Sequence, residues 1–159
     1  HMGVKLAHAM GAEVTVLTRS APKAGEAKAL GAHHVLLASD TDSIKRATGT
    51  FDFVLDTIPV VHELDPYLRL VRTHGALVLV GVIDTIPAFS SRLLIGGRKS
   101  LSGSAIGGIA ETQELLDFCA AKGVAADCEM TTMPRINEAF ERMARGDVRY
   151  RFVIDMQTL

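Results

Sequence analysis

The feature that most constrains this chain is the alternation of short apolar, β-branched segments with helical patterns along most of its length. The strand-like segments are nearly continuously apolar, which is typical of strands buried on both faces of a parallel sheet. We expect strands at 13–17, 34–37, 51–56, 76–81, 99–104 and 150–156. The predicted fold class is therefore α/β, with a doubly wound parallel sheet covered by helices on both faces.

Between the expected strands, apolar residues recur at helical spacing and the boundary signals of helices accompany them. Pro22 opens one helical segment and Gly31 closes it, while Glu111 and Lys122 complement the dipole of another. We expect helices at 3–10, 22–30, 42–48, 64–71, 90–95, 111–122 and 134–145. No repeat, low-complexity stretch or interdomain linker interrupts the series.

Composition narrows the class of protein. The chain is 48% hydrophobic with a net charge of −1, so it lacks the basic excess of a nucleic-acid binder. No apolar run reaches the length of about 18 residues that a membrane span needs, and no secretory signal is visible. The two cysteines, Cys119 and Cys128, have no CxxC or His-rich spacing that would predict a disulfide framework or a zinc site. We therefore expect a cytoplasmic protein without nucleic-acid or membrane partners.

In a doubly wound sheet, ligands bind beyond the carboxyl ends of the strands, so the residues there are the candidate site. The expected 13–17 strand is followed by Thr18, Arg19 and Ser20, with Lys23 three residues further on. An NAD-binding fold usually places a carboxylate at this point, whereas the 2′-phosphate of NADP calls for cations and hydroxyl donors. The absence of a carboxylate favours NADP; a solvated turn with ordinary surface charges is the alternative.

Three further strand ends carry small or hydroxyl-bearing residues, namely Thr57 after Asp56, then Val80, Gly81 and Val82, then Ser102, Gly103 and Ser104. Such residues let backbone approach a flat ligand and offer hydroxyls to a ribose or carboxamide. Any one of these sets is more often an ordinary strand-ending turn. The prediction of a ligand site therefore rests on the occurrence of three such sets at strand ends. The pattern of Asp56 is typical of a structural capping residue, and no histidine has the spacing of a metal ligand. We predict no catalytic and no metal-binding residue in this chain.

Several strings resemble the cinnamyl-alcohol-dehydrogenase branch of the medium-chain, zinc-dependent alcohol dehydrogenases. They are DTIPVVH at 56–62, HGALVLVG at 74–81, IGGRKSLSGSAIGG at 95–108, ETQE at 111–114 and GDVRYRFVID at 146–155. The resemblance covers nearly the whole chain, and its long ungapped strings are far more specific than a lone glycine motif.

The resemblance implies roles for the candidate residues. Thr18, Arg19, Ser20 and Lys23 would hold the 2′-phosphate of NADP, and Arg19 departs from the small hydroxyl residues usual in the family. Thr57 would lie by the nicotinamide ribose, while Val80, Gly81, Val82, Ser102, Gly103 and Ser104 would line the nicotinamide. The strand at 99–104 would be the sheet edge through which two copies form a homodimer.

The resemblance also implies that part of the family pattern lies outside this sequence. The GxGxxG fingerprint follows a first strand, and only Gly3 corresponds to its last glycine, so we expect a Rossmann-type sheet that lacks its first strand. We assign residues 1–147 to an NADP-binding domain and residues 148–159 to a strand that returns to an absent catalytic domain. That domain would supply the zinc ligands, so we expect the chain alone to be inactive. We expect it to bind NADPH weakly or not at all, because the helix that begins at Gly3 lacks the turn that would aim backbone N–H groups at the pyrophosphate.

By resemblance, the intact enzyme would interconvert aldehydes and primary alcohols with NADP and zinc. A stand-alone nucleotide-binding or regulatory module is the alternative. An S-adenosylmethionine-dependent methyltransferase ranks last, because it calls for an acidic residue where Arg19 stands. Without its first strand, the sheet would have two unpaired inner edges. We expect residues 150–156, from this chain or exchanged from a second copy, to fill the gap by pairing with the 13–17 or the 51–56 strand. The alternatives are that these two strands move together, or that the tail lies loosely on the surface.

Overall fold

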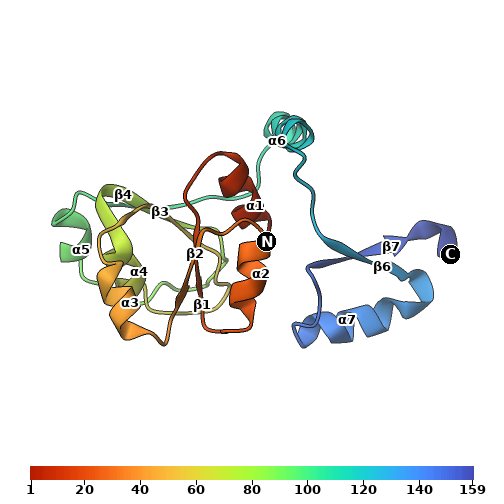
Figure 1. Ribbon diagram of the computed structural model, residues 1–159, viewed down its shortest axis with the longest axis horizontal. Coiled ribbons are helices and arrows are strands. Elements are labelled where there is room, and N and C mark those ends of the chain that lie inside the picture. Colours follow the sequence, from red (N-terminus) through yellow and green to blue (C-terminus); the bar gives the residue numbers. More distant parts are fainter. The chain divides into compact units, whose positions relative to one another are not determined.

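The structure of the chain is a computed structural model that describes all residues from 1 to 159. The chain divides into two compact units. The first comprises residues His1–Val16, Pro22–Val35 and Gln113–Leu159, and the second comprises Leu17–Ala21 and Leu36–Thr112. Helices and strands alternate along the chain in the order expected of an α/β protein (Figure 1). No helix is long and apolar enough to cross a lipid bilayer.

The helices and strands have these bounds: α1 Met2–Ala9, β1 Thr15–Thr18, α2 Lys23–Ala29, β2 His34–Leu37, α3 Thr41–Arg46, β3 Phe51–Asp56, α4 Asp65–Leu70, β4 Val71–Leu79, α5 Arg92–Ile95, β5 Ser100–Gly103, α6 Ile109–Lys122, β6 Cys128–Thr132, α7 Ile136–Ala144 and β7 Arg151–Asp155. Short 3₁₀ turns occupy Met133–Arg135 and Met156–Thr158. Strand β1 pairs with β2, the strands β3, β4 and β5 form one sheet in that order, and β6 pairs with β7.

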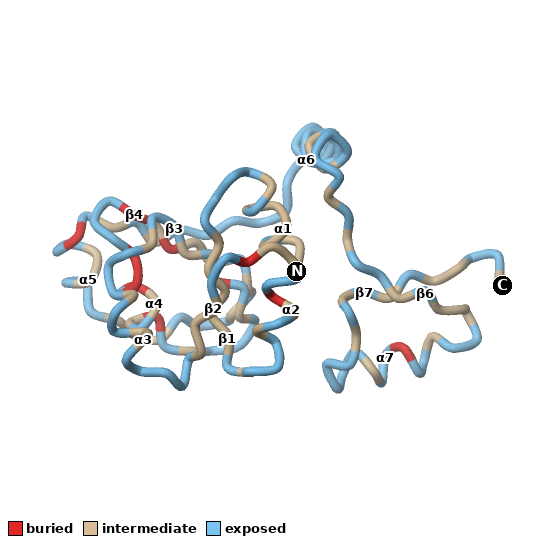
Figure 2. Tube along the Cα trace, viewed as in Figure 1, coloured by how far each residue is buried: buried red, intermediate tan, exposed pale blue.

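The second unit is built around the parallel sheet β3–β4–β5. The fully buried core comprises Leu68 of α4, Leu64 just before that helix, and Val71 and Leu77 of β4. Figure 2 shows this burial along α4 and the strand that follows it. Because successive strand residues point to opposite faces, Val54 packs on this core while its neighbours Phe53 and Leu55 are exposed on the other face.

Strand β4 is longer than the sequence indicated. Its expected start was Ala76, because His74 and Gly75 predict a turn, but pairing with β3 begins at Val71. The strand passes His74 at a positive φ of 63°, and the register between β3 and β4 shifts there, as in a β-bulge. A Cβ on Gly75 would lie 2.7 Å from the carbonyl oxygen of Asp52, so glycine permits the two strands to close up beyond the bulge.

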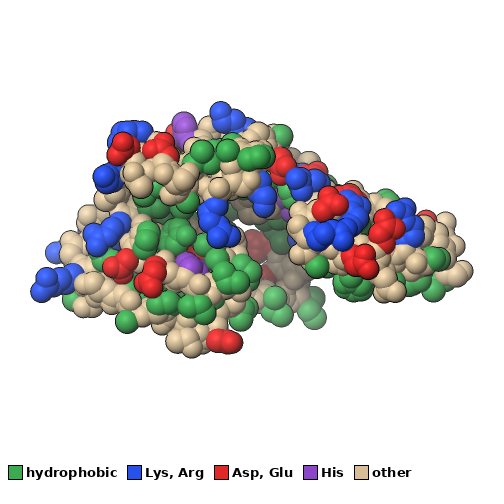
Figure 3. All heavy atoms as spheres, turned by 90° about the horizontal axis from the view of Figure 1, so that it is seen from below, with side chains coloured by type: hydrophobic (Ala, Val, Ile, Leu, Met, Phe, Trp, Pro, Cys, Tyr) green, Lys and Arg blue, Asp and Glu red, His purple; other side chains and the backbone are tan.

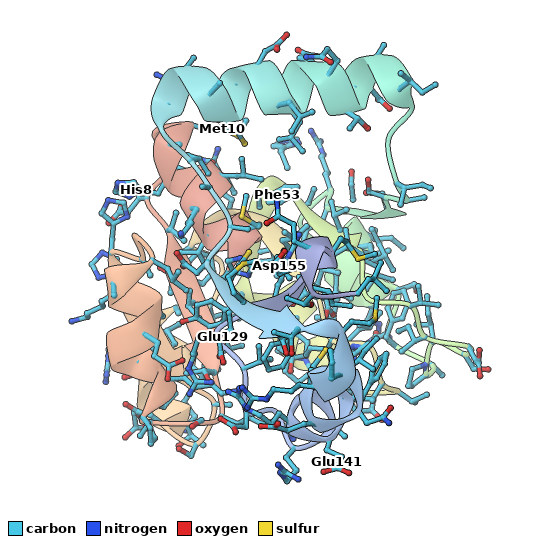
Figure 4. The ribbon with its side chains drawn as sticks, turned by 90° about the vertical axis from the view of Figure 1, so that its right-hand side faces the viewer. His8, Met10, Phe53, Glu129, Glu141 and Asp155 are labelled. Atoms are coloured by element: carbon cyan, nitrogen blue, oxygen red, sulfur yellow. The ribbon has the colours of Figure 1, made fainter.

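In the first unit, β6, α7 and β7 form a β–α–β arrangement with parallel strands (Figure 4). Glu129 on β6 accepts hydrogen bonds from Arg142 of α7 at 2.7 Å and from the backbone N–H of Arg149 at 2.8 Å. Arg142 also donates to Asp147 at 3.0 Å and lies 4.8 Å from the ring centroid of Phe152. The guanidinium therefore joins the helix to both strands.

The expectation that residues 150–156 pair with the 13–17 or the 51–56 strand is wrong. Strand β7 instead pairs with β6 over five residues, from Cys128 opposite Arg151 to Thr132 opposite Asp155. Strand β6 was not predicted, because Glu129, Thr131 and Thr132 interrupt its apolar character. The last strand thus has a partner nearby in sequence, reached through the short helix α7, and such local pairing has a smaller loop-closure cost than insertion between distant strands.

Candidate functional site at a sheet edge

The carboxyl ends of β3, β4 and β5 meet at one edge of the sheet. The register places Asp56 opposite Leu79 and Leu79 opposite Gly103, so the three parallel strands end level with one another. Thr57, Val80 and Ser104 are the next residues of the chain and lie at this edge, which we call the β3–β5 edge. The structure thus brings together the three sets of residues that the sequence analysis singled out at strand ends.

Backbone hydrogen bonds tie the segments of the β3–β5 edge to one another. The N–H groups of Val80 and Gly81 donate to the carbonyl of Asp56 at 2.9 and 3.1 Å. The N–H of Ser104 donates to the carbonyl of Leu79 at 3.0 Å. These bonds fix the backbone that carries Thr57 and Ser104, whose side chains are exposed. The positions of their hydroxyls at the edge are thereby restricted.

The exposed members of the edge include both polar and apolar groups. Ser102, Gly103 and Ser104 are exposed beside Val80, and Val82 is 84% exposed. Val60 and Val61 of the loop after β3 are also exposed, at 60% and 61%. Figure 3 shows how hydrophobic side chains, in green, reach the surface among charged ones. An edge with hydroxyls, open backbone and apolar side chains suits a flat, partly polar ligand.

Gly81 is required by the close approach of the loop after β3. A Cβ at this position would lie 2.6 Å from the carbonyl carbon of Ile58 and 2.9 Å from its amide nitrogen. Gly103 differs, because a Cβ there would meet only the carbonyl oxygen of Leu79, at 3.7 Å. Close packing against Ile58 therefore requires glycine at position 81, whereas a side chain at position 103 would have room.

Asp56, at the end of β3, is the one buried charged residue of the chain. One oxygen, Oδ1, accepts the N–H of Ile58 at 3.0 Å, which is the capping role that the sequence analysis indicated. The other oxygen, Oδ2, lies 2.7 Å from Nε2 of His62. No role was predicted for His62, because its separation of six residues from Asp56 matches no common motif.

Tyr67 closes the cluster around Asp56 and His62. Its ring meets that of His62 edge-on, with centroids 5.4 Å apart and an interplanar angle of 82°. Burial and then the charge of Asp56 raise the pKa of Tyr67, against a smaller lowering by the guanidinium of Arg19. Arg19 therefore exerts its charge on the same part of the second unit.

The turn after β1 presents the cation and hydroxyls expected there. The hydroxyl oxygen of Thr18 accepts the N–H of Ser20 at 3.1 Å and keeps its own hydrogen free to donate. Arg19 is exposed and forms no ion pair within the chain. Gly3 and Lys23 belong to the first unit, where they lie exposed in the first turns of α1 and α2.

Two other features contain none of the candidate site residues. A cavity of about 260 Å³ in the first unit is lined by Lys5, His8, Ala9, Leu30, Lys122, Gly123, Val124 and Ala125, none of them a candidate residue. Lys5 there is bound to Asp127 at 2.8 Å and to the carbonyl of Ala125 at 2.9 Å. No group of three or more His, Cys, Asp or Glu side chains is arranged to hold a metal ion, and Cys119 and Cys128 are unpaired.

Comparison with known proteins relates this chain to alcohol dehydrogenases and to an aldehyde reductase. The family profile described as zinc-binding dehydrogenase matches residues 1–121. The chain is 50% identical over 157 residues to Probable cinnamyl alcohol dehydrogenase 1 of Nicotiana tabacum, covering 98% of this chain and 44% of that protein. It is also 50% identical to Aldehyde reductase YahK of Escherichia coli, covering 100% of this chain and 46% of that protein. The chain thus spans less than half the length of these curated relatives.

Solved structures agree with the sequence relatives. A cinnamyl alcohol dehydrogenase from Sorghum bicolor superposes with a TM-score of 0.91 at 40% identity, covering 98% of this chain and 44% of that one. The CAD of Helicobacter pylori, solved in complex with NADP(H), superposes with a TM-score of 0.83 at 34% identity and the same coverage. These matches confirm the doubly wound, Rossmann-like fold class and the resemblance to cinnamyl alcohol dehydrogenases. The chain therefore belongs to the zinc-binding dehydrogenase family.

Proposed function

We propose that this chain is the nucleotide-binding part of an NADP-dependent, zinc-type alcohol dehydrogenase that reduces aldehydes and oxidises primary alcohols. The observation that carries the proposal is the β3–β5 edge, where three parallel strands end level and present hydroxyls and accessible backbone. The chain belongs to a family of dehydrogenases, which fits a coenzyme at this edge. The names of the relatives support the reaction class, since they are alcohol dehydrogenases and an aldehyde reductase.

The preference for NADP rests on the turn after β1. Thr18 and Ser20 supply hydroxyls and Arg19 an exposed cation without an internal partner, and no carboxylate stands beside them to accept the ribose hydroxyls of NAD. Lys23 begins α2 with a second exposed cation. Each charge-assisted hydrogen bond to a phosphate is worth about 1.5–3 kcal/mol, or roughly 10- to 100-fold in affinity. The 2′-phosphate of NADP is the group that this turn suits.

The rest of the coenzyme would lie along the β3–β5 edge. We assign Thr57 to the nicotinamide ribose, and Val80, Gly81, Val82, Ser102, Gly103 and Ser104 to the nicotinamide ring and its carboxamide. Gly3 would approach the pyrophosphate from the start of α1. The role of these residues is to bind and orient the coenzyme, which when bound supplies the hydride.

The proposed zinc site lies in the part of the whole protein outside this chain. The side chains of this chain offer no cluster for a metal, so none of them is assigned as a ligand. In the whole enzyme, zinc would polarise the substrate carbonyl. We propose that its ligands come from the remaining length that the relatives have, and that the chain on its own is inactive. The division at 147/148 between a nucleotide-binding domain and a returning strand remains part of this proposal.

We also propose a cytoplasmic homodimer. The exposed edge of β5, within residues 99–104, is open to a second copy, and Ile106 and Ile109 beyond it are 97% and 93% exposed. An open strand edge flanked by exposed isoleucines is prone to association. The two unpaired cysteines suit a reducing compartment.

The direct test is an assay of the whole protein with primary alcohols and aldehydes, with and without removal of zinc by a chelator. We expect NADPH-dependent reduction of aldehydes that is lost on chelation and restored by zinc. Absence of turnover with either substrate class and either coenzyme, in a protein loaded with zinc, would overturn the proposal.

A further inference from the structure

We infer that Asp56 and His62 form a clasp that holds the loop 57–61 against the end of β4, and that they are positioning residues for the nucleotide. The inference rests on the proposed function for its second half, the effect on the coenzyme. Its first half, the holding of the loop, concerns the chain alone.

Both ring nitrogens of His62 face acceptors. Nδ1 lies 2.8 Å from the carbonyl oxygen of Val60, and Nε2 lies 2.7 Å from Oδ2 of Asp56. A carbonyl can only accept, so Nδ1 carries a hydrogen, and an ionised Asp56 then requires a hydrogen on Nε2 as well. The contacts therefore favour the doubly protonated imidazolium facing a carboxylate.

Burial makes this pairing consequential. The side chain of Asp56 is 3% exposed and that of His62 is 14% exposed, so neither charge is well solvated. Removing one partner of such a pair leaves a buried charge uncompensated, which is far more costly than the loss of an exposed pair. The other oxygen of Asp56 accepts the N–H of Ile58, so one carboxylate binds both Ile58, near the start of the loop, and His62, just after it.

The clasp fixes the positions of two candidate nucleotide contacts. Thr57 lies between Asp56 and Ile58, whose backbone is held by the carboxylate. The backbone of Ile58 in turn leaves no room for a side chain on Gly81, and Gly81 donates its N–H to the carbonyl of Asp56. If the contact between His62 and Asp56 were lost, the loop would be less firmly held, and so would Thr57 and the end of β4 that packs on Ile58.

The charged groups around His62 set its protonation. Burial lowers the pKa of His62, but the hydrogen bonds to Val60 and Asp56 and the charge of Asp56 together raise it, and the pKa lies above its ordinary value of 6.5. Tyr67 of α4 faces the ring edge-on, and Arg19 acts on that tyrosine from the turn after β1. A raised pKa means that the stability contributed by protonated His62 is fully present below pH 6.5 and is lost as the pH rises through the folded-state pKa, above which the ring has one N–H left for its two acceptors.

Nitrogen NMR of the imidazole and amide hydrogen exchange test the clasp in the 159-residue chain. We expect His62 to be doubly protonated at pH 6, with slow exchange at Ile58, Val80 and Gly81. His62→Phe keeps the ring packing on Tyr67 but removes both hydrogen bonds, and we expect exchange at these amides to rise about ten- to a hundredfold. His62→Gln retains one donor and should give an intermediate rise, which keeps the test decisive if the Phe variant does not fold. Glu63→Gln, at the exposed neighbour, is the control.

The second readout is the KM for NADPH in the whole protein. We expect His62→Phe and His62→Gln to raise this KM more than they lower kcat. In the wild type we expect KM to rise as the pH increases through the folded-state pKa of His62, and we expect this pH dependence to be absent from both variants. A singly protonated His62 at pH 6, or exchange rates unchanged in both variants, would overturn the clasp. An unchanged KM beside faster exchange would overturn the positioning role. A wild-type protein that does not use NADPH would instead refute the proposed function, with the exchange data still deciding the clasp.

Discussion

The backbone of Ile58 occupies the space that a side chain on Gly81 would need. A Cβ there would stand 2.6 Å from the carbonyl carbon of Ile58, well inside van der Waals contact. The loop after β3 and the end of β4 are thus packed backbone on backbone at the β3–β5 edge. The shape of the candidate site depends on this contact.

Gly81→Ala tests the contact. Because backbone atoms cannot yield as a flexible side chain can, we expect the variant to lose about 1–3 kcal/mol of unfolding free energy, as overpacked sites do. Urea denaturation measures the loss. Gly103→Ala is the matched control, since its Cβ would meet one atom at 3.7 Å. Equal stability of the two variants would show that Ile58 does not lie where the structure has it.

The core of the second unit supplies another prediction. Leu68 is completely buried on α4, and Leu68→Ala should cost about 2–5 kcal/mol by loss of burial and by the cavity left behind. Leu116 on α6 is 58% exposed, so Leu116→Ala should change stability by no more than about 0.5 kcal/mol. Denaturant unfolding followed by circular dichroism compares them. A Leu68→Ala variant as stable as Leu116→Ala would contradict this core.

Acid sensitivity should arise in part from Glu129. The N–H of Arg149 and then the guanidinium of Arg142 hold the pKa of Glu129 below its ordinary value. A lowered folded-state pKa gives stability that is present above the unfolded-state pKa and is lost as the pH falls through the folded-state value. We therefore expect Glu129→Gln to flatten the fall in stability below about pH 5, whereas Glu114→Gln, at an exposed position, should not.

The proposed dimer depends on the residues beyond β5. Because Ile106 and Ile109 are almost fully exposed, we expect the double change Ile106→Asp, Ile109→Asp to shift the whole protein from dimer to monomer in sedimentation velocity. Ile95→Asp, at a site that is 74% exposed on α5, serves as the control and should leave the dimer intact. A wild-type protein that is monomeric at high concentration would refute the dimer.

Local patterns predicted the fold well where apolar character was continuous. The strands 34–37 and 51–56 have the bounds that the sequence indicated, and each expected helix is present within a few residues. Helix α6 begins two residues early because Glu111 reaches back to the N–H of Gly108 at 2.7 Å, a capping contact. Strand β6 was missed because its polar residues are held by partners distant in sequence, as Glu129 is by Arg142 and Arg149.

The candidate site was predictable in its composition and only partly in its chemistry. Parallel strands must end at a common edge, so the gathering of Thr57, Val80 and Ser104 followed from the fold class. The capping role of Asp56 also followed from its place at a strand end. The partnership of Asp56 with His62 did not, because it depends on how the loop folds back, and neither propensity nor periodicity encodes that return.

The central claim is that the turn after β1 selects NADP. The most direct measurement compares KM for NADPH and NADH in the whole protein carrying Arg19→Ala and Lys23→Ala with that in the wild type. Both cations are exposed, so the variant should fold, and we expect KM for NADPH to rise about 10- to 100-fold per lost phosphate contact while KM for NADH changes little. The control changes Lys28 and Arg92, also exposed, to Ala. An equal rise in KM for both coenzymes, or a wild-type preference for NADH, would contradict the claim.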